Sequence, residues 1–260
     1  MPFYPKKQDQ DAILWRNAVV AAGGIVGGSQ FNNIQILIRT LKTCGAWALT
    51  DDYAVYATAD NSPTQALVTL KKRVMQTLAH GTSTNPTFVV NRGFLGNVDG
   101  YINTGWNPAT ATLYTQNVAR FGAWAYQLGT GSNYSLIGAD DANVTEIIVS
   151  PGVKYRYGVN TAGLPSSSTV ATGLTVAART GSGAQATYLN GAANGTDTSA
   201  SIILVNRDFY VLATNNGATA AHVGDFGVSC AFYGAALLNA AMYSAEYAAL
   251  RTFMTAVGVP

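Results

Sequence analysis

Few residues in this sequence could carry out hydrolytic chemistry. Cleavage of a glycosidic bond needs two carboxyl groups that face each other across the sugar. The chain has only two glutamates, Glu146 and Glu246, and Glu246 lies in a predicted C-terminal helix. Asp140 and Asp141 are adjacent, so in an extended segment their side chains point to opposite faces of the strand. The placement of the acids therefore indicates no catalytic pair.

Other catalytic motifs are equally absent from the sequence. The two histidines, His80 and His222, stand near no motif, which favours surface or hydrogen-bonded roles over metal ligation. The chain contains no G-x-S-x-G, no H-E-x-x-H and no P-loop lysine after its glycine-rich segment VAAGGIVGGSQ. We therefore predict a protein that is not an enzyme.

Composition and charge narrow the class of protein further. Only 11% of the 260 residues are charged, against about 25% in an ordinary soluble domain. The net charge is only +2, so nothing in the charge balance calls for nucleic acid as a partner. No apolar run is long enough to span a bilayer. The polar start MPFYPKKQDQD lacks the apolar h-region that a signal peptide requires. We expect a chain made in a cytoplasm, with neither nucleic acid nor membrane as a partner.

The elements that would position a site change in type near residue 86. Helical patterns cover residues 9–22 and 30–44, with Ser29 as the expected N-cap of the second, and the sequence SPTQ at 62–65 is a capping box. A last helix carries an apolar stripe from Tyr243 to Val257.

After residue 86 the pattern has a period of two. Nine short strand candidates are bounded by glycine, asparagine, aspartate, serine or proline, and Asn190-Gly191 fits a type I′ hairpin turn. This pattern favours a two-sheet sandwich or jelly roll. The candidates cover residues 87–90, 117–128, 145–150, 154–159, 173–179, 185–191, 201–205, 209–214 and 227–235.

Four segments of the sequence resemble known proteins. YLNGAANG (188–195) resembles the Y-x-N-G hairpin of laminin-G-like, concanavalin A-like jelly rolls, and FYGAALLNAAMYSAEYAAL (232–250) resembles their closing strand and helix. GYINTGWNPAT (100–110) and RTFMTAVGV (251–259) resemble proteins encoded by tailed bacteriophages and prophages. The E-x-D-x-x-E strand motif of jelly-roll glucanases is absent.

The resemblance implies a fold and a domain division. The expected fold is mostly β: a concanavalin A-like, laminin-G-like two-sheet jelly-roll sandwich, with a small α-helical N-terminal part and a C-terminal helix. Residues 1–85 would form a helical docking segment, the end of which can already belong to the sandwich through a strand QALVTLKK (65–72). Residues 86–260 would form the jelly roll and its closing helix.

The resemblance also implies a function. We expect a non-enzymatic structural protein of the bacteriophage virion, a tail fibre or capsid spike, that binds a bacterial surface polysaccharide during host attachment. The alternative is a purely architectural capsid decoration or tail-assembly protein without a ligand. Other virion proteins would be its partners, and a homo-oligomer, for which a trimer is the usual symmetry, is expected.

Glycan sites in this superfamily lie on end loops or on the concave face, which gives candidate residues. Aromatic side chains would stack on sugar rings while aspartate and asparagine bind hydroxyl groups. An aromatic platform of Phe94, Tyr101 and Trp106 is the functional alternative to buried aromatics in residues 91–110. The candidates for glycan binding are Trp106, Asp140, Asp141, Asn143, Tyr155, Tyr157, Asn215 and Asn216.

A cofactor is not required by any motif, but some laminin-G-like domains bind Ca²⁺ through oxygen ligands. Three clusters offer such oxygens, ADDAN (139–143), NGTD (194–197) and HVGDFG (222–227), of which the first is the best. The alternative is that these residues form polar turns, in which aspartate and asparagine bind the local backbone.

Overall fold

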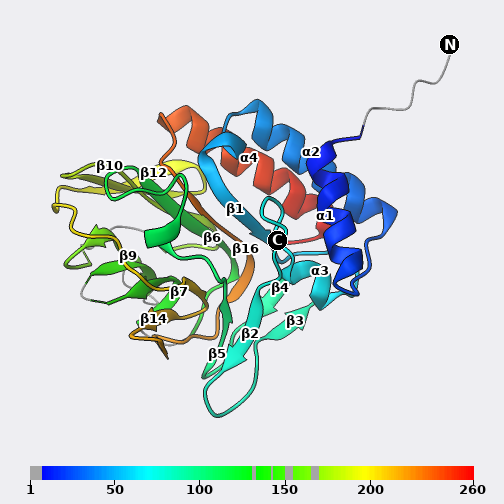
Figure 1. Ribbon diagram of the computed structural model, residues 1–260, viewed down its shortest axis with the longest axis horizontal. Helices are drawn as coiled ribbons and strands as arrows, with labels where there is room; N and C mark the ends of the chain where they lie inside the picture. The colour runs from blue at the N-terminus through cyan, green and yellow to red at the C-terminus, as the bar shows by residue number, and fades with distance from the viewer. Residues whose placement is uncertain (1–7, 131–132, 142, 150–154, 165–169) are drawn as a thin grey trace.

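The fold is mostly β and arranged in three layers, with helices packed on one sheet and that sheet packed on a second (Figure 1). The computed structural model describes residues 8–130, 133–141, 143–149, 155–164 and 170–260. Two curled sheets form the sandwich, and helices stand near both ends of the chain, which confirms the predicted fold class.

The helices begin and end where local capping allows. The Asp9 carboxylate accepts a hydrogen bond from the amide of Asp11 and starts α1 (Gln10–Ala21). Helix α2 (Gly28–Thr43) begins one residue before the predicted cap, Ser29, which therefore lies inside it. Asn239 caps α4 (Ala240–Val257), which ends at Gly258 with a φ of 92°. Among the described residues, no helix is long and apolar enough to cross a membrane.

Sheet 1 is the central layer. Its strand order is β12-β11-β10-β6-β16-β4-β3, and β1 pairs with β16 as well. The sheets therefore begin at residue 50, inside the segment expected to be helical. The bounds of these strands are β1 (Thr50–Val55), β3 (Thr87–Val89), β4 (Gly93–Leu95), β6 (Ala119–Gln127), β10 (Gly173–Gly181), β11 (Ala184–Leu189), β12 (Ala192–Asp197) and β16 (Gly227–Gly234).

Sheet 2 is the outer layer opposite the helices. Its order is β15-β14-β7-β13-β5-β2, and β7 also pairs with β8, which pairs with β9. The bounds of these strands are β2 (Thr77–His80), β5 (Gly100–Asn103), β7 (Tyr134–Asp140), β8 (Val144–Val149), β9 (Tyr155–Thr161), β13 (Tyr210–Val211), β14 (Thr214–Asn216) and β15 (Thr219–Ala221). Short helical turns connect the layers at η1 (Trp47–Leu49), α3 (Pro63–Leu67) and η2 (Pro108–Thr110).

Side-chain alternation along sheet 1 separates two cores. On β6, Trp124 and Tyr126 pack with the helices, whereas Phe121, Ala123 and Ala125 face sheet 2. The strand is buried on both faces, which explains why its sequence has few polar residues. In sheet 2 only one face joins the core between the sheets. We call the other face, which is turned away from sheet 1, the outer face.

Two predicted strands are wrong and one predicted turn is confirmed. Residues 65–72 do not form a strand, because the Ser62 hydroxyl accepts from the amide of Gln65 and starts α3. Residues 201–205 form no strand, and the Ile203 side chain is 70% exposed. Asn190 and Gly191 both have positive φ at the tip of the β11–β12 hairpin, as the type I′ turn requires.

A buried ion pair joins α4 to sheet 1. Arg120 Nη2 lies 2.8 Å from Glu246 Oε1, and both side chains are fully buried. Tyr53 donates its hydroxyl to the same carboxylate oxygen at 2.6 Å, and Arg120 donates to the Thr50 hydroxyl at 2.6 Å. Gly234, the β16 residue paired with both Arg120 and Thr50, has no side chain to separate them. The pair therefore fixes the position of the C-terminal helix.

Candidate functional site

A stacked pair of tyrosines marks the outer face of sheet 2. Ile102 on β5 and Val211 on β13 point into the core, so their neighbours Tyr101 and Tyr210 point outward. The two rings stack with centroids 4.3 Å apart and an angle of 27° between their planes. Burial, followed by the neighbouring Tyr101, raises the pKa of Tyr210 to about 12. Its hydroxyl therefore stays protonated at neutral pH and can donate a hydrogen bond.

Two adjacent hollows flank this pair, and Ala218 lines both. The His80 hollow has a volume of about 230 Å³ and contains Tyr101 in its wall. The Asn206 hollow has a volume of about 250 Å³ and contains Tyr210. The His80 hollow is completed by His80, Gly81, Asp99, Thr219, Ala220 and Val223, and the Asn206 hollow by Asn107, Asn206, Arg207, Asp208 and Asn215.

The hairpin between the hollows, β14–β15, has a strained backbone. Ala218 in its turn has a φ of 71°, as does Leu212 before the hairpin, and His222 directly after the hairpin has a φ of 53°. A left-handed conformation is unfavourable for residues that carry a Cβ, and such strain concentrates at functional sites. Asn215 holds the hairpin in place, because its side chain accepts from the amide of Ala218 and donates to the carbonyl of Asp208.

Replacing Ala218 with glycine should relieve this strain. We expect Ala218→Gly to stabilise the fold by about 0.5–1 kcal/mol, because glycine adopts positive φ without steric cost. The matched control is Ala220→Gly on β15, where glycine should destabilise by a similar amount. Urea denaturation of the two variants checks the prediction, and equal destabilisation by both would show that Ala218 stores no strain.

A group of charged side chains lies beside the hollows. Glu146 on β8 pairs with Gly138 on β7. Because Gly138 has no side chain, the Glu146 carboxylate has room to accept a hydrogen bond from the Thr214 hydroxyl on β14. His222 Nδ1 lies 3.6 Å from Glu146 Oε2. Burial and the charge of Glu146 raise the pKa of Asp140. Glu146 is itself only 1% exposed, so a ligand on the outer face would reach it through His222 rather than directly.

This group should make stability depend on pH. Interaction with Glu146 raises the pKa of His222, with a smaller contribution from Asp140 and opposition from burial and Arg156. The stabilisation is fully present below about pH 6.5, the pKa of a free histidine, and is lost as the pH rises through the higher folded-state pKa.

We expect His222→Asn, which tolerates the positive φ, to lose under about 1 kcal/mol at pH 5.5 and almost nothing at pH 8.5. The side chain is 40% exposed, which keeps the effect small. Thermal denaturation of both proteins at the two pH values measures it. A loss of stability that is the same at both values would show that the ion pair contributes nothing.

Five of the eight predicted glycan-binding residues lie near one another. Asp140, Asp141 and Asn143 lie at the β7–β8 turn, and β14 brings Asn216 into register with Asp140. Asn215 lines the Asn206 hollow directly. Asp141 Oδ2 lies 3.7 Å from Arg207 Nε, which connects the turn with the same hollow.

The three predicted aromatic residues are buried, and their assignment to a surface site is corrected. Trp106 stacks on Tyr233 with centroids 4.1 Å apart in the core between the sheets. Tyr155 and Tyr157 are fully buried in that core, because β9 places them on the inner face of sheet 2. Of the alternative platform, Phe94 is buried as well and only Tyr101 is partly exposed.

Several residues of the site were not predicted from the sequence. Tyr210, His80, Asp99 and Arg207 line the hollows without belonging to a motif. No signal was present for Tyr210: its side chain is itself only 6% exposed, and the run FYVLA (209–213) is apolar or aromatic throughout. The other three come from loops or strand ends that only the tertiary fold brings together.

The acid residues also combine differently from the expectation. Asp140 and Glu146 project from the same face because a hairpin, rather than one strand, brings them together. Two of the possible calcium ligands already accept hydrogen bonds within the protein, since Asp197 accepts from Gln185 and Ser199, and Asp225 accepts from the distant Thr130. Within the described part of the chain, no three acid, histidine or cysteine side chains are placed to hold a metal ion.

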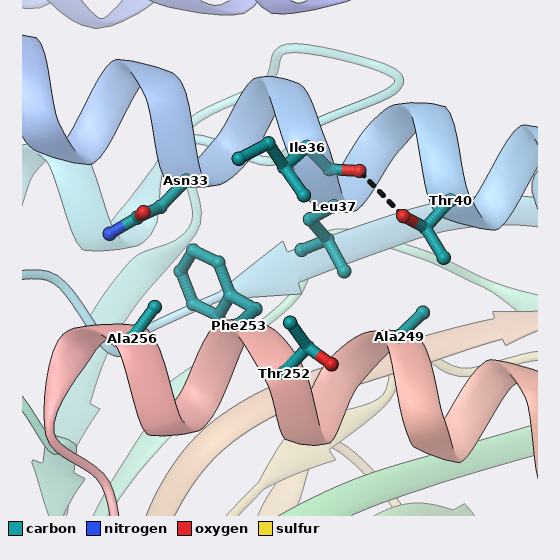
Figure 2. Close-up of a pocket in the computed structure, with 8 residues that line it drawn as sticks. All are labelled: Asn33, Ile36, Leu37, Thr40, Ala249, Thr252, Phe253 and Ala256. Atoms are coloured by element: carbon teal, nitrogen blue, oxygen red, sulfur yellow. Dashed lines mark hydrogen bonds between the residues drawn. The ribbon is translucent and has the colours of Figure 1, made fainter.

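A groove between α2 and α4 is a further depression, and Figure 2 shows Leu37 and Phe253 in the space between the two helices. Thr40 donates its hydroxyl to the carbonyl of Ile36 along its rim. The groove offers only about 50 Å³, far below the ~300 Å³ at which small-molecule pockets begin. It is lined by Asn33, Ile36, Leu37, Thr40, Ala249, Thr252, Phe253 and Ala256.

No family model and no curated protein matches the sequence. Solved structures do resemble the fold. A Trypanosoma rangeli sialidase in complex with 2,3-difluorosialic acid has a TM-score of 0.51 and 10% identity, covering 86% of this chain and 40% of its own. Domain 4 of AbnA, a GH43 extracellular arabinanase from Geobacillus stearothermophilus, in complex with arabinotriose, has a TM-score of 0.50 and 11% identity, covering 76% of this chain and 98% of its own.

At this level of identity the similarity shows the fold alone, and this chain spans only about two fifths of the sialidase. The neighbours nevertheless correct one prediction. The prediction that the protein is not an enzyme is contradicted, because the structures that this chain resembles come from glycosidases. Absent sequence motifs therefore do not exclude catalysis in a chain with this fold.

Proposed function

We propose that this chain is a carbohydrate-binding β-sandwich and that the outer face of sheet 2 binds the glycan. The observation that carries the proposal is the Tyr101–Tyr210 pair between two hollows, each of which has a carboxylate in its lining and one of which also has three side-chain amides. Ligand sites typically combine apolar or aromatic walls with a few convergent polar groups. The exposed part of Tyr101 would contact the apolar face of a sugar ring, and Asn206, Asn215 and Asp208 would bind hydroxyl groups.

The structural neighbours support a carbohydrate as the ligand. The arabinanase domain, of which this chain spans nearly the whole length, was solved in complex with arabinotriose. The sialidase was solved in complex with a difluorosialic acid. A glycan array probed with the labelled protein tests the proposal, and we expect a small set of related glycans to bind. No binding to any glycan at high protein concentration would contradict it.

We also propose that the protein is a structural component of a bacteriophage particle that attaches to a bacterial surface polysaccharide. The support is the resemblance of residues 100–110 and 251–259 to phage and prophage proteins. Electron microscopy of particles with a labelled antibody against the chain tests this part. We expect label at the tail tip or on capsid projections, and particles that carry no label would contradict it.

A further inference from the structure

We infer that the site takes an uncharged glycan of at least two sugar units, one unit in each hollow with the Tyr101–Tyr210 pair between them. This inference rests on the proposed function and specifies the class of ligand. Its basis is the size, the lining and the charge of the two hollows.

Size is the first argument. The His80 hollow has about 230 Å³ and the Asn206 hollow about 250 Å³, so each is smaller than the ~300 Å³ at which small-molecule pockets begin. Together they fall well inside that range. They are contiguous, because Ala218 lines both and the two tyrosine rings stack against each other across the boundary. A ligand that binds firmly must therefore occupy both hollows.

The linings differ, which implies different contacts for the two units. In the Asn206 hollow, Asn107 donates its side-chain amide to the side-chain carbonyl of Asn206 at 3.0 Å, beside Asn215. These amides suit the hydroxyl groups of a sugar. In the His80 hollow, Ala218, Ala220 and Val223 contribute apolar surface to the lining alongside Tyr101. The second unit would place an apolar ring face, or a methyl substituent, against that surface.

The charges disfavour an acidic glycan. Asp99 lines one hollow and Asp208 the other, and Asp141 stands 3.7 Å from Arg207, the cation of the Asn206 hollow. A uronic or sialic acid would meet these carboxylates at short range, where like charges repel. A neutral, hydroxyl-rich glycan avoids this repulsion.

Isothermal titration calorimetry with a glycan selected on the array, and with its mono-, di- and trisaccharide fragments, tests the inference. We expect the disaccharide to bind at least tenfold more tightly than either monosaccharide, with little further gain from the trisaccharide. A monosaccharide that binds as tightly as the disaccharide would overturn the inference and leave the proposed function intact. An array that selects mainly acidic glycans would overturn the neutral class.

Blocking variants locate the two subsites. Thr219→Trp fills the His80 hollow and Asn206→Trp fills the Asn206 hollow, and both side chains are exposed, so the fold should tolerate them. We expect each variant to bind the disaccharide no more tightly than a monosaccharide, so that the tenfold difference in affinity disappears. Thr255→Trp on the exposed side of α4 is the control and should bind like the wild type. Full disaccharide affinity in either blocking variant would overturn the two-subsite arrangement. If the array showed no bound glycan at all, the proposed function and this inference would both be overturned.

Discussion

Truncating Arg120 to alanine should remove about 3–5 kcal/mol of stability, which is a large part of the total for most domains. The change leaves the Glu246 carboxylate buried without its cation, and Tyr53 alone would remain as a strong donor to it. Urea denaturation at neutral pH measures the loss. Because the pair attaches α4 to sheet 1, we also expect protection from hydrogen exchange to fall first in α4.

The control for this prediction removes both charges. Arg120 Nε and Nη1 and Glu246 Oε2 have no hydrogen-bond partner among the described residues, so the pair is incompletely satisfied. The double variant Arg120→Met with Glu246→Leu should therefore recover most of the stability that either single variant loses. If Arg120→Ala cost less than about 1 kcal/mol, the pair would not hold the helix.

Replacing Tyr101 with alanine should weaken glycan binding by about 10- to 100-fold, which is the effect expected for an aromatic side chain at the centre of a site. Its loss removes the wall between the two hollows and uncovers Tyr210. Since Tyr101 is partly exposed, the change in stability should be much smaller than for a core aromatic. Calorimetric titration with an array-selected glycan measures the affinity.

Tyr101→Phe separates stacking from hydrogen bonding at the same position. It keeps the ring, so we expect it to retain most of the affinity if stacking dominates. An alanine variant that folds normally and binds as well as the wild type would show that the glycan contacts another surface.

Much of the fold could be predicted from local sequence. Acidic residues at the start and glycines at the end placed α1 within one residue, and apolar periodicity placed α2 within two residues. The apolar stripe of α4 ended where that helix ends, and Asn190-Gly191 fixed a hairpin because type I′ turns need positive φ at both positions. The strand predicted for residues 201–205 is wrong. Their apolar run is typical of a strand, but in the fold it has no neighbouring strand in register. Strand β1 was missed because TDDYAV (50–55) carries two aspartates, whose carboxylates accept hydrogen bonds from loop amides.

The site was less predictable. Asp140, Asp141 and Asn143 lie together at one turn because they are near neighbours in the sequence, whereas the position of Asn215 beside a hollow depends on the tertiary fold. Aromatic residues gave no guidance, because a buried Tyr157 and a half-exposed Tyr101 differ only in the face of the strand on which they lie. That face is set by the pairing of distant strands, as for Tyr101 on β5 and Tyr210 on β13.

The most direct test of the proposed glycan site is a nuclear magnetic resonance titration of the isotope-labelled protein with an array-selected glycan. If the outer face of sheet 2 binds the glycan, the largest amide shifts should fall on Tyr101, Tyr210 and the β14–β15 hairpin, with smaller shifts at His80 and Asn206. Shifts confined to the groove between α2 and α4, or to the hairpin of β11 and β12, would contradict the assignment of the site.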